Sequence, residues 1–220
     1  EAFPSTFPAA AKVSYTGNPV RREIRSLRNS ASLMDVSGRP LRLLVLGGSL
    51  GAEALNSILP ELIVSAPSGS IQTLHQTGRQ QFVRTLQRYQ QLGQDTEKTH
   101  RVVAFIDEMG EAYQWADIVL SRSGASTVCE IAVAAKPAIF VPYPFHKDRQ
   151  QLRNANWLHA AGAAEVVEQH DLDVDRLMQV LTRLMTDLGR LREMGLSASK
   201  VAICDAHTRI ADLCLEAAYG

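Results

Sequence analysis

Apolar and polar positions follow two rhythms along this chain, and the two rhythms alternate. Short apolar runs such as Leu41–Leu46 end in glycine or small polar residues, which predicts buried strands. Longer segments such as 52–64 carry apolar residues one helical turn apart, for example Leu55 and Leu59. The pattern predicts six strands, at 41–46, 71–75, 102–105, 118–121, 138–141 and 164–167. Helices are expected at 52–64, 80–92, 108–115, 126–134, 149–161, 171–185, 189–194 and 199–218.

This repeated strand–helix alternation predicts an α/β fold, a Rossmann-like parallel sheet with helices on both faces. Ligands of such sheets bind at the carboxyl ends of the strands. The rule gathers five loops around a single crevice, namely 47–49, 76–78, 105–107, 121–124 and 141–148.

The chain divides into three expected parts. Residues 1–26 are proline-rich and precede the first methionine, Met34, so we interpret them as a linker and the end of an N-terminal domain left out of this chain. Residues 27–198 form the Rossmann-like domain. Residues 199–220 form a C-terminal helix that can pack on the absent domain, and that exposes an apolar stripe if it does not. The stripe comprises Ile203, Ala206, Ile210, Leu213, Cys214 and Ala217.

Composition and charge exclude several classes of protein. The 220 residues are 45% hydrophobic and 21% charged, which is typical of a globular chain. The formal net charge of zero argues against a broad nucleic-acid surface. Three cysteines without a CxxC pair indicate no disulfide and fit a reducing cytoplasm. The sequence has no apolar run of the roughly 18 residues that span a bilayer, so membrane contact is expected to be peripheral.

Two loops after strands are candidates for phosphate binding. Gly47 and Gly48 allow the backbone to approach a ligand closely, and Ser49 can bind phosphate or simply cap a helix. The second loop opens a helix at 123–127, where free backbone N–H groups and the positive end of the helix dipole favour an anion. An ordinary helix cap without a ligand is the alternative for both loops.

Polar residues beyond these loops suit the sugars of a nucleotide-sugar donor. Glu130 lies one turn into the second helix and can bind a ribose diol, or can only stabilise the helix dipole. The loop 145–151 ends in Gln150 and Gln151, whose amides match hexose hydroxyls, although a plain solvated loop has the same composition. No second histidine stands at ligand spacing from His146, so we expect no metal site.

With these residues laid out, the chain resembles the bacterial peptidoglycan glycosyltransferases that add N-acetylglucosamine to undecaprenyl-diphosphate-N-acetylmuramoyl-pentapeptide. The matching segments occur in the same order along nearly the whole chain. They are TGNPVR at 16–21, LGGSLGA at 46–52, HQTG at 75–78, FIDEM at 105–109, ADIVLSRSGASTVCEIA at 116–132 and FVPYPFHKDRQQLRNA at 140–155. The resemblance implies one half of a GT-B architecture, the C-terminal half that binds the donor.

The resemblance also implies a binding set for UDP-N-acetylglucosamine. Its members are Arg21, Ser49, Phe105, Ile106, Ala125, Ser126, Thr127, Glu130, Gln150 and Gln151. Ser49 and the amides at 125–127 would hold the diphosphate, with Arg21 nearby. The backbone of Ile106 would bind the uracil edge, with Phe105 beside it.

The remaining members would bind the two sugars. Glu130 would hold the ribose, while Gln150 and Gln151 would reach the N-acetylglucosamine. The glutamine loop is one residue longer than in the family, which leaves this assignment open by one position. Ser126 stands where a larger apolar residue is common, which matters little if the backbone makes the contact.

The implied activity is an inverting hexosyl transfer that needs neither metal nor cofactor, because helix N-termini can stabilise the departing diphosphate. In that family the general base, the site of the lipid-linked acceptor and the membrane-facing patch lie in the N-terminal half. We therefore expect this chain to bind the donor with little or no transfer alone, in the cytoplasm at the inner face of the membrane. The alternatives are a non-catalytic donor-binding subunit that pairs with a membrane-bound partner, and a sugar-nucleotide epimerase, for which no catalytic acid and histidine set is apparent.

Overall fold

The computed structural model describes residues 8, 13–28, 36, 38–48, 51–146 and 148–219. The described strands form one six-stranded sheet in the order β3-β2-β1-β4-β5-β6, and all five neighbouring pairs are parallel. The strands are β1 (Leu41–Leu46), β2 (Ile71–Gln76), β3 (His100–Val103), β4 (Ile118–Ser121), β5 (Ala138–Phe140) and β6 (Ala164–Val166). The predicted Rossmann-like α/β fold is confirmed.

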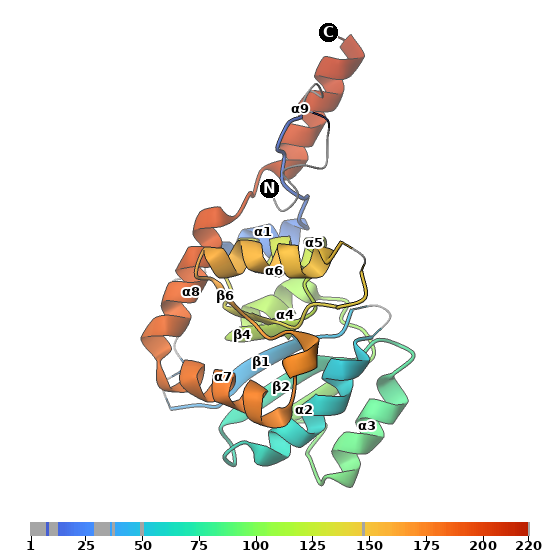
Figure 1. Cartoon of the computed structure of the whole chain (residues 1–220), viewed down its shortest axis with the longest axis vertical. Coiled ribbons are helices and arrows are strands. Elements are labelled where there is room, and N and C mark those ends of the chain that lie inside the picture. Colours follow the sequence, from blue (N-terminus) through green and yellow to red (C-terminus); the bar gives the residue numbers. More distant parts are fainter. Residues whose placement is uncertain are drawn as a thin grey trace.

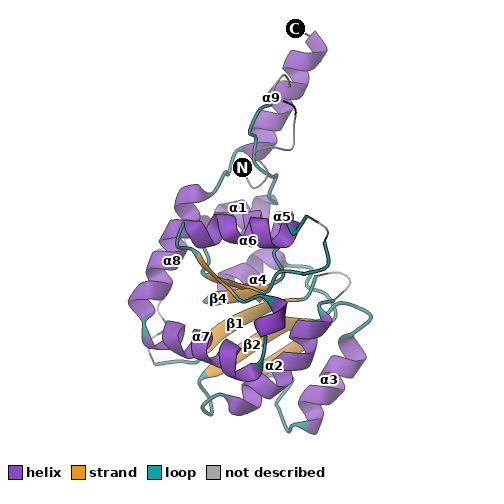
Figure 2. Cartoon of the chain, viewed as in Figure 1, coloured by secondary structure: helices purple, strands orange, loops and turns teal. Residues whose placement is uncertain are grey.

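Helices cover both faces of this sheet (Figures 1 and 2). The described α-helices are α1 (Arg22–Arg25), α2 (Glu53–Ser65), α3 (Phe82–Gln91), α4 (Met109–Trp115), α5 (Ala125–Val133), α6 (Gln150–Ala160), α7 (Val174–Thr186), α8 (Leu188–Val201) and α9 (Ala206–Tyr219). Successive residues of β1 point to opposite faces: Leu43 belongs to the core under α2 and α7, and Leu44 to the core under α4, α5 and α6. Burial on both faces explains why β1 and β4 are apolar apart from Arg42 and Ser121.

The strand predicted at 102–105 is two residues out of place. β3 spans His100–Val103, and His100 pairs with Thr73 of β2. The His100 ring is buried and its Nδ1 lies 3.2 Å from the Thr73 hydroxyl. A polar residue therefore occupies an inward position, which a hydrophobic pattern does not reveal.

The C-terminal helices also differ from the prediction. The segments predicted at 189–194 and 199–218 are instead the continuous helix α8 and a separate α9, and the chain leaves the helix at Ala202 with extended φ and ψ of −68° and 133°. Gly195 stays inside α8 because a Cβ there would lie 2.8 Å from the carbonyl oxygen of Ala135, so this glycine allows the helix to pack closely.

The last helix, α9, projects away from the layers (Figure 1). Of the apolar stripe predicted on it, Ala206 is buried and Ile210 is half-buried, whereas Leu213 and Cys214 are exposed. No helix among the described residues is long and apolar enough to cross a membrane.

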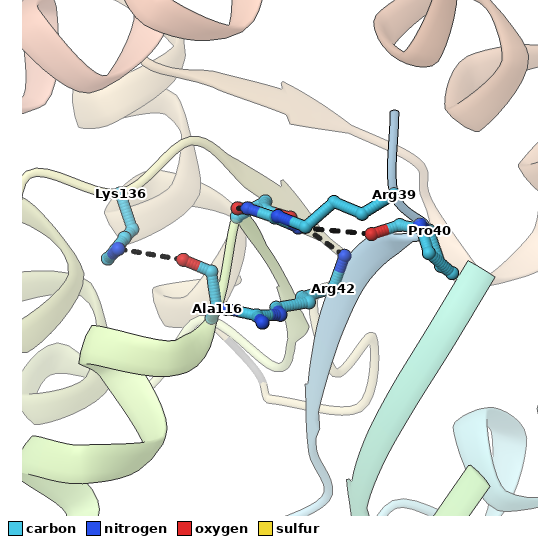
Figure 3. Close-up of polar contacts among 6 residues, drawn as sticks. Arg39, Pro40, Arg42, Ala116 and Lys136 are labelled. Atoms are coloured by element: carbon cyan, nitrogen blue, oxygen red, sulfur yellow. Dashed lines mark hydrogen bonds and ion pairs between the residues drawn. The ribbon is translucent and has the colours of Figure 1, made fainter. Parts of the chain in front are cut away.

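Polar contacts join β1 and β4 where these strands begin (Figure 3). Arg39 donates to both carboxylate oxygens of Asp117, at 2.6 and 2.8 Å, and the backbone N–H of Arg42 donates to the same carboxylate at 2.8 Å. Asp117 is buried, and its three donors satisfy the charge. Beside it, Lys136 donates to the carbonyl of Ala116 at 2.7 Å, and burial lowers the pKa of this lysine to about 8.

Candidate functional site

A cleft of about 1090 Å³ opens at the carboxyl edge of the sheet. Its walls come from the end of β2, from the loops that follow β1 to β5 and from the first turns of α5 and α6. Gly48 on one side and Gly124 on the other both line it. The loops expected to share one crevice therefore do so, as the rule for parallel sheets predicts.

The glycine turn after β1 packs tightly on the end of β2. A Cβ on Gly51 would lie 2.5 Å from the carbonyl oxygen of Thr77, and Gly51 has a left-handed φ of +83°. The Gly47 N–H donates to the carbonyl of Gln76 at 2.8 Å. A Cβ on Gly47 would also lie 2.8 Å from this carbonyl oxygen, so both positions favour glycine, and both line the cleft. Ser49 lies outside the described residues, between Gly48 and Gly51, which both line the cleft.

The first turn of α5 faces the same cleft without a side-chain cap. Its N-cap is Gly124, which makes no capping hydrogen bond through a side chain. The first backbone N–H groups of a helix have no partner within it, so those of Ala125, Ser126 and Thr127 are available as donors to an anion. Thr127 lines the cleft, whereas Ala125 and Ser126 are exposed and do not line it with their side chains. We therefore expect these two residues to contact a ligand in the cleft through their backbone N–H groups.

Glu130 is held by two donors from different elements. Its Oε1 accepts from Arg21 Nη2 at 3.2 Å, and its Oε2 accepts from the Tyr113 hydroxyl at 3.2 Å. The Glu130 side chain is only 15% exposed, whereas that of Arg21 is 47% exposed. Burial and the neighbouring carboxylate of Glu130 raise the pKa of Tyr113 well above its ordinary value, so this hydroxyl keeps its proton and remains a donor. The arrangement fixes a carboxylate and a guanidinium on one wall of the cleft.

Two residues after β3 form a second part of the wall. Ile106 is buried and Phe105 is 45% exposed, and both line the cleft. The guanidinium of Arg79 lies 5.8 Å from the centre of the Phe105 ring, within the range of a cation–π contact.

The two predicted glutamines point to different places. Gln151 lines the cleft, and its Oε1 accepts from the backbone N–H groups of Ser123 and Tyr143 at 3.2 and 2.9 Å. Gln150 is exposed, does not line the cleft and donates to Asp148 at 2.8 Å. Adjacent residues of α6 point about 100° apart, so only one of the pair can face the cleft.

Arg122 is a cleft residue that the sequence did not single out. It donates to the carbonyls of Val141 and Pro142 at 2.9 and 3.2 Å, and to Gln169 Oε1 at 2.6 Å. Arg122 directly follows β4, in a loop that the sequence had already assigned to the crevice, so its position could have predicted a place in the cleft. No such signal marks Gln169, because it follows β6 and reaches the cleft only through the tertiary fold.

A buried hydrogen-bond chain lies beneath the glycine turn. Tyr89 and Asn56 contact the two ring nitrogens of His75 at 3.1 and 3.0 Å, and Asn56 Nδ2 donates to the carbonyl of Thr77 at 2.9 Å. Because Asn56 presents its oxygen to the ring, His75 Nε2 carries the proton. Complete burial lowers the pKa of His75 to about 3, so the ring is neutral and supports the Thr77 carbonyl that contacts Gly51.

The described residues contain no group of three or more His, Cys, Asp or Glu side chains able to hold a metal ion. The candidate donors to an anion in the described part of the cleft include the backbone N–H groups of the first turn of α5 and the guanidinium groups of Arg21 and Arg122.

Comparison with known proteins extends the resemblance found in the sequence. The glycosyltransferase family 28 C-terminal domain matches residues 42–210. The UDP-N-acetylglucosamine–N-acetylmuramyl-(pentapeptide) pyrophosphoryl-undecaprenol N-acetylglucosamine transferase of Stutzerimonas stutzeri is 43% identical over 100% of this chain and 60% of that protein. The corresponding protein of Histophilus somni is 39% identical over 98% of this chain and 58% of its own length.

Solved structures agree with these relatives. The MurG crystal structure from Acinetobacter baumannii matches with a TM-score of 0.80 at 36% identity, over 98% of this chain and 59% of that one. The UDP-GlcNAc 2-epimerase of Neisseria meningitidis, bound to UDP-GlcNAc, matches with a TM-score of 0.57 at 12% identity, over 87% of this chain and 48% of that one. This second likeness shows a shared fold alone. The chain spans about 60% of the length of the curated relatives it matches.

Proposed function

This chain belongs to the glycosyltransferase family 28 C-terminal domains, and from that premise we propose that it provides the donor site of an N-acetylglucosaminyltransferase. The donor is UDP-N-acetylglucosamine, and the acceptor is the lipid-linked muramoyl-pentapeptide named in its relatives. One observation carries the proposal: a single cleft combines a glycine turn, an uncapped helix N-terminus, a carboxylate and a guanidinium.

The diphosphate lies between the two loops at the centre of the sheet. The backbone N–H groups of residues 125–127 donate to it, together with the turn that contains Ser49. Arg21 lines the cleft and its side chain is half exposed, so it can exchange its contact with Glu130 for a phosphate oxygen. Amides at a helix N-terminus suit this task, since they are fixed before the ligand arrives.

The nucleoside and the sugar extend to opposite sides of the diphosphate. The backbone of Ile106 binds the uracil edge with Phe105 beside it, and Glu130 accepts hydrogen bonds from the ribose hydroxyls. Gln151 binds the N-acetylglucosamine. Gln150, which was expected to share this role, faces Asp148 in the structure and joins the site only if the loop rearranges.

The transfer proceeds with inversion at the anomeric carbon. An acceptor hydroxyl oxygen forms a bond to that carbon while the bond to the diphosphate oxygen breaks, and the hydroxyl proton passes to a general base. UDP departs with an additional negative charge, which the amides of α5 and Arg21 stabilise without a metal or another cofactor. We expect the base, the acceptor site and the peripheral membrane contact in the part of the relatives that this chain does not cover, at the inner face of the cytoplasmic membrane.

The proposal is tested by calorimetric titration of the chain with UDP-N-acetylglucosamine, UDP-N-acetylgalactosamine, UDP-glucose and a purine nucleotide sugar. We expect uridine-selective binding that is strongest for UDP-N-acetylglucosamine. Equal affinity for the purine nucleotide sugar would overturn the uracil assignment, and absence of binding would overturn the donor site. Appreciable transferase turnover by the chain alone would contradict the proposal that the general base and the acceptor site lie outside this chain.

A non-catalytic donor-binding subunit that pairs with a separate acceptor subunit would have the same cleft. A reading frame that continues upstream of Glu1 would favour the single-chain enzyme. Binding of a separately encoded membrane protein that restores transfer would favour the subunit.

A further inference from the structure

Three ring side chains stand together on the wall of the cleft that follows β5. Tyr143 contacts Phe145 edge to face, with ring centres 5.3 Å apart and planes inclined by 71°. The centre of the His146 ring lies 5.1 Å from that of Tyr143, with the planes inclined by 66°. We call Tyr143, Phe145 and His146 the aromatic rim. All three line the cleft, and the Phe145 side chain is 73% exposed.

The aromatic rim is anchored at its base. Arg122 holds the carbonyls of Val141 and Pro142, and its guanidinium lies 5.7 Å from the centre of the Tyr143 ring. The backbone N–H of Tyr143 donates to Gln151 Oε1. Both tethers come from residues that themselves line the cleft. Tyr143, against which the other two rings pack, is therefore held in place before a ligand binds.

The order of the strands indicates which part of a ligand meets this rim. Phe105 and Ile106 follow β3 at one end of the sheet, the two phosphate loops follow β1 and β4 at its centre, and the rim follows β5. A nucleotide that places its base near Phe105 and its phosphates at the centre directs the group beyond the phosphates toward β5. That group is the sugar of the donor.

We propose that the aromatic rim is a stacking platform for the pyranose ring of the nucleotide sugar, an inference that rests on the proposed function. One face of a pyranose carries C–H bonds with a slight positive charge, and these are attracted to the negative face of an aromatic ring. The amides of Gln151 and Gln169 beside the rim can bind the hydroxyls at the edge of the sugar. An exposed phenylalanine on a polar cleft wall gains an apolar partner in this way.

The test compares the affinities of UDP and UDP-N-acetylglucosamine for the wild-type chain and for Phe145→Ala. We expect the variant to bind UDP-N-acetylglucosamine about 3- to 10-fold more weakly, by analogy with the energy of a pair of aromatic rings, and to bind UDP as the wild type does. Phe145→Trp should restore sugar binding. The matched control is Tyr219→Ala, which removes an aromatic side chain that is 87% exposed on α9, away from the cleft.

Each outcome decides a different point. Unchanged binding of UDP-N-acetylglucosamine by Phe145→Ala, in a chain whose circular dichroism matches the wild type, would overturn the platform and leave the rim free to contact another protein surface. An equal loss for UDP and the sugar nucleotide would also overturn it, because the effect would not be on the sugar. Failure of the wild type to bind UDP would overturn the proposed function itself, and the inference with it.

Discussion

The guanidinium of Arg21 lies 3.2 Å from the carboxylate of Glu130, although 109 residues separate the two in the chain. This contact joins the segment before α1 to the first turns of α5 on one wall of the cleft. An ion pair with one half-exposed partner contributes little to stability, about 0–1 kcal/mol. Its larger effect is to hold the carboxylate and the cation at fixed positions before a ligand binds.

We expect Glu130→Gln to weaken UDP-N-acetylglucosamine binding about tenfold while the thermal midpoint changes little, because a neutral amide is a poorer acceptor for ribose hydroxyls. Calorimetry with UDP and with 2′,3′-dideoxy-UDP gives the check. The wild type should prefer UDP, and the variant should lose that preference. A variant that still distinguishes the two ligands as well as the wild type does would remove Glu130 from the ribose site.

Gly51→Ala should destabilise the chain by about 2–4 kcal/mol, because it combines a left-handed backbone with a clash against the Thr77 carbonyl. Gly69→Ala is the matched control: Gly69 has a φ of +71° with nothing within 4 Å of its added Cβ, so about 1 kcal/mol is expected there. Urea denaturation measures both free energies of unfolding. Equal losses would show that the turn after β1 tolerates a side chain.

His75 makes stability depend on pH in the acid range. Its folded pKa of about 3 is below the ordinary value of 6.5, so between these values the unfolded chain binds a proton that the folded chain does not. The free energy of unfolding should therefore fall by up to about 1.4 kcal/mol per pH unit as pH decreases through this window. Urea denaturation of His75→Gln should show a shallower fall than the wild type.

The control for this prediction is His170→Gln, since the His170 side chain is 72% exposed. It should leave the slope unchanged. Identical slopes for the wild type and His75→Gln would mean that His75 accepts a proton within the folded chain.

Lys136 makes the free energy of unfolding depend on pH in the alkaline range. Burial brings its pKa down from 10.5 to about 8, so between these values the unfolded chain again binds the extra proton, and the contribution of this lysine to stability rises with pH. Lys136→Met should remove that rise, whereas Lys200→Met, at an exposed position, should retain it. Chemical denaturation at a series of pH values tests the difference. A rise that persists in Lys136→Met would have another origin.

Removal of α9 should cost the remainder of the chain less than about 1 kcal/mol, because few of its residues are buried. A chain that ends at Asp205 is compared with the full chain by urea denaturation. A much larger loss would make α9 an integral part of this domain, against the three-part division expected from the sequence. Self-association through the apolar stripe stays a prediction for sedimentation.

The apolar pattern located β1 and β4 to the residue, because both strands are buried on two faces and are apolar apart from Arg42 and Ser121. It misplaced β3, where a buried histidine bonds to Thr73. It also ended a helix at Met194, whereas α8 continues through Gly195 to Val201. Gly195 lies inside the helix because a Cβ there would clash with the carbonyl oxygen of Ala135. The local pattern therefore predicted correctly the strands that are buried on both faces. It failed at positions where a polar or small residue contacts one residue far away in the sequence.

The residues of the candidate site were likewise predictable where a local motif marked them, and not where only the tertiary fold brings them together. The residues expected from loops and from the family motifs, including Arg21, Glu130 and Gln151, lie around one cleft. Arg122 and Gln169 meet only when the loop after β4 is brought to the turn after β6, so no spacing in the sequence links them. The sequence predicted both Gln150 and Gln151 in the site, whereas only Gln151 lines the cleft. The direction of each side chain depends on the register of α6, which the sequence did not fix.

The sheet order has a kinetic consequence. Within each half of the sheet, neighbouring strands are joined by one helical connection, whereas the central pair β1–β4 brings Leu43 against Ile118 across β2, β3 and three helices. Closing a longer chain segment costs more entropy, and non-local pairing slows folding. We therefore expect β1-β2-β3 and β4-β5-β6 to collapse early as two separate units, and the rate-limiting barrier to lie at their association. The binding cleft, which spans both units, would form last.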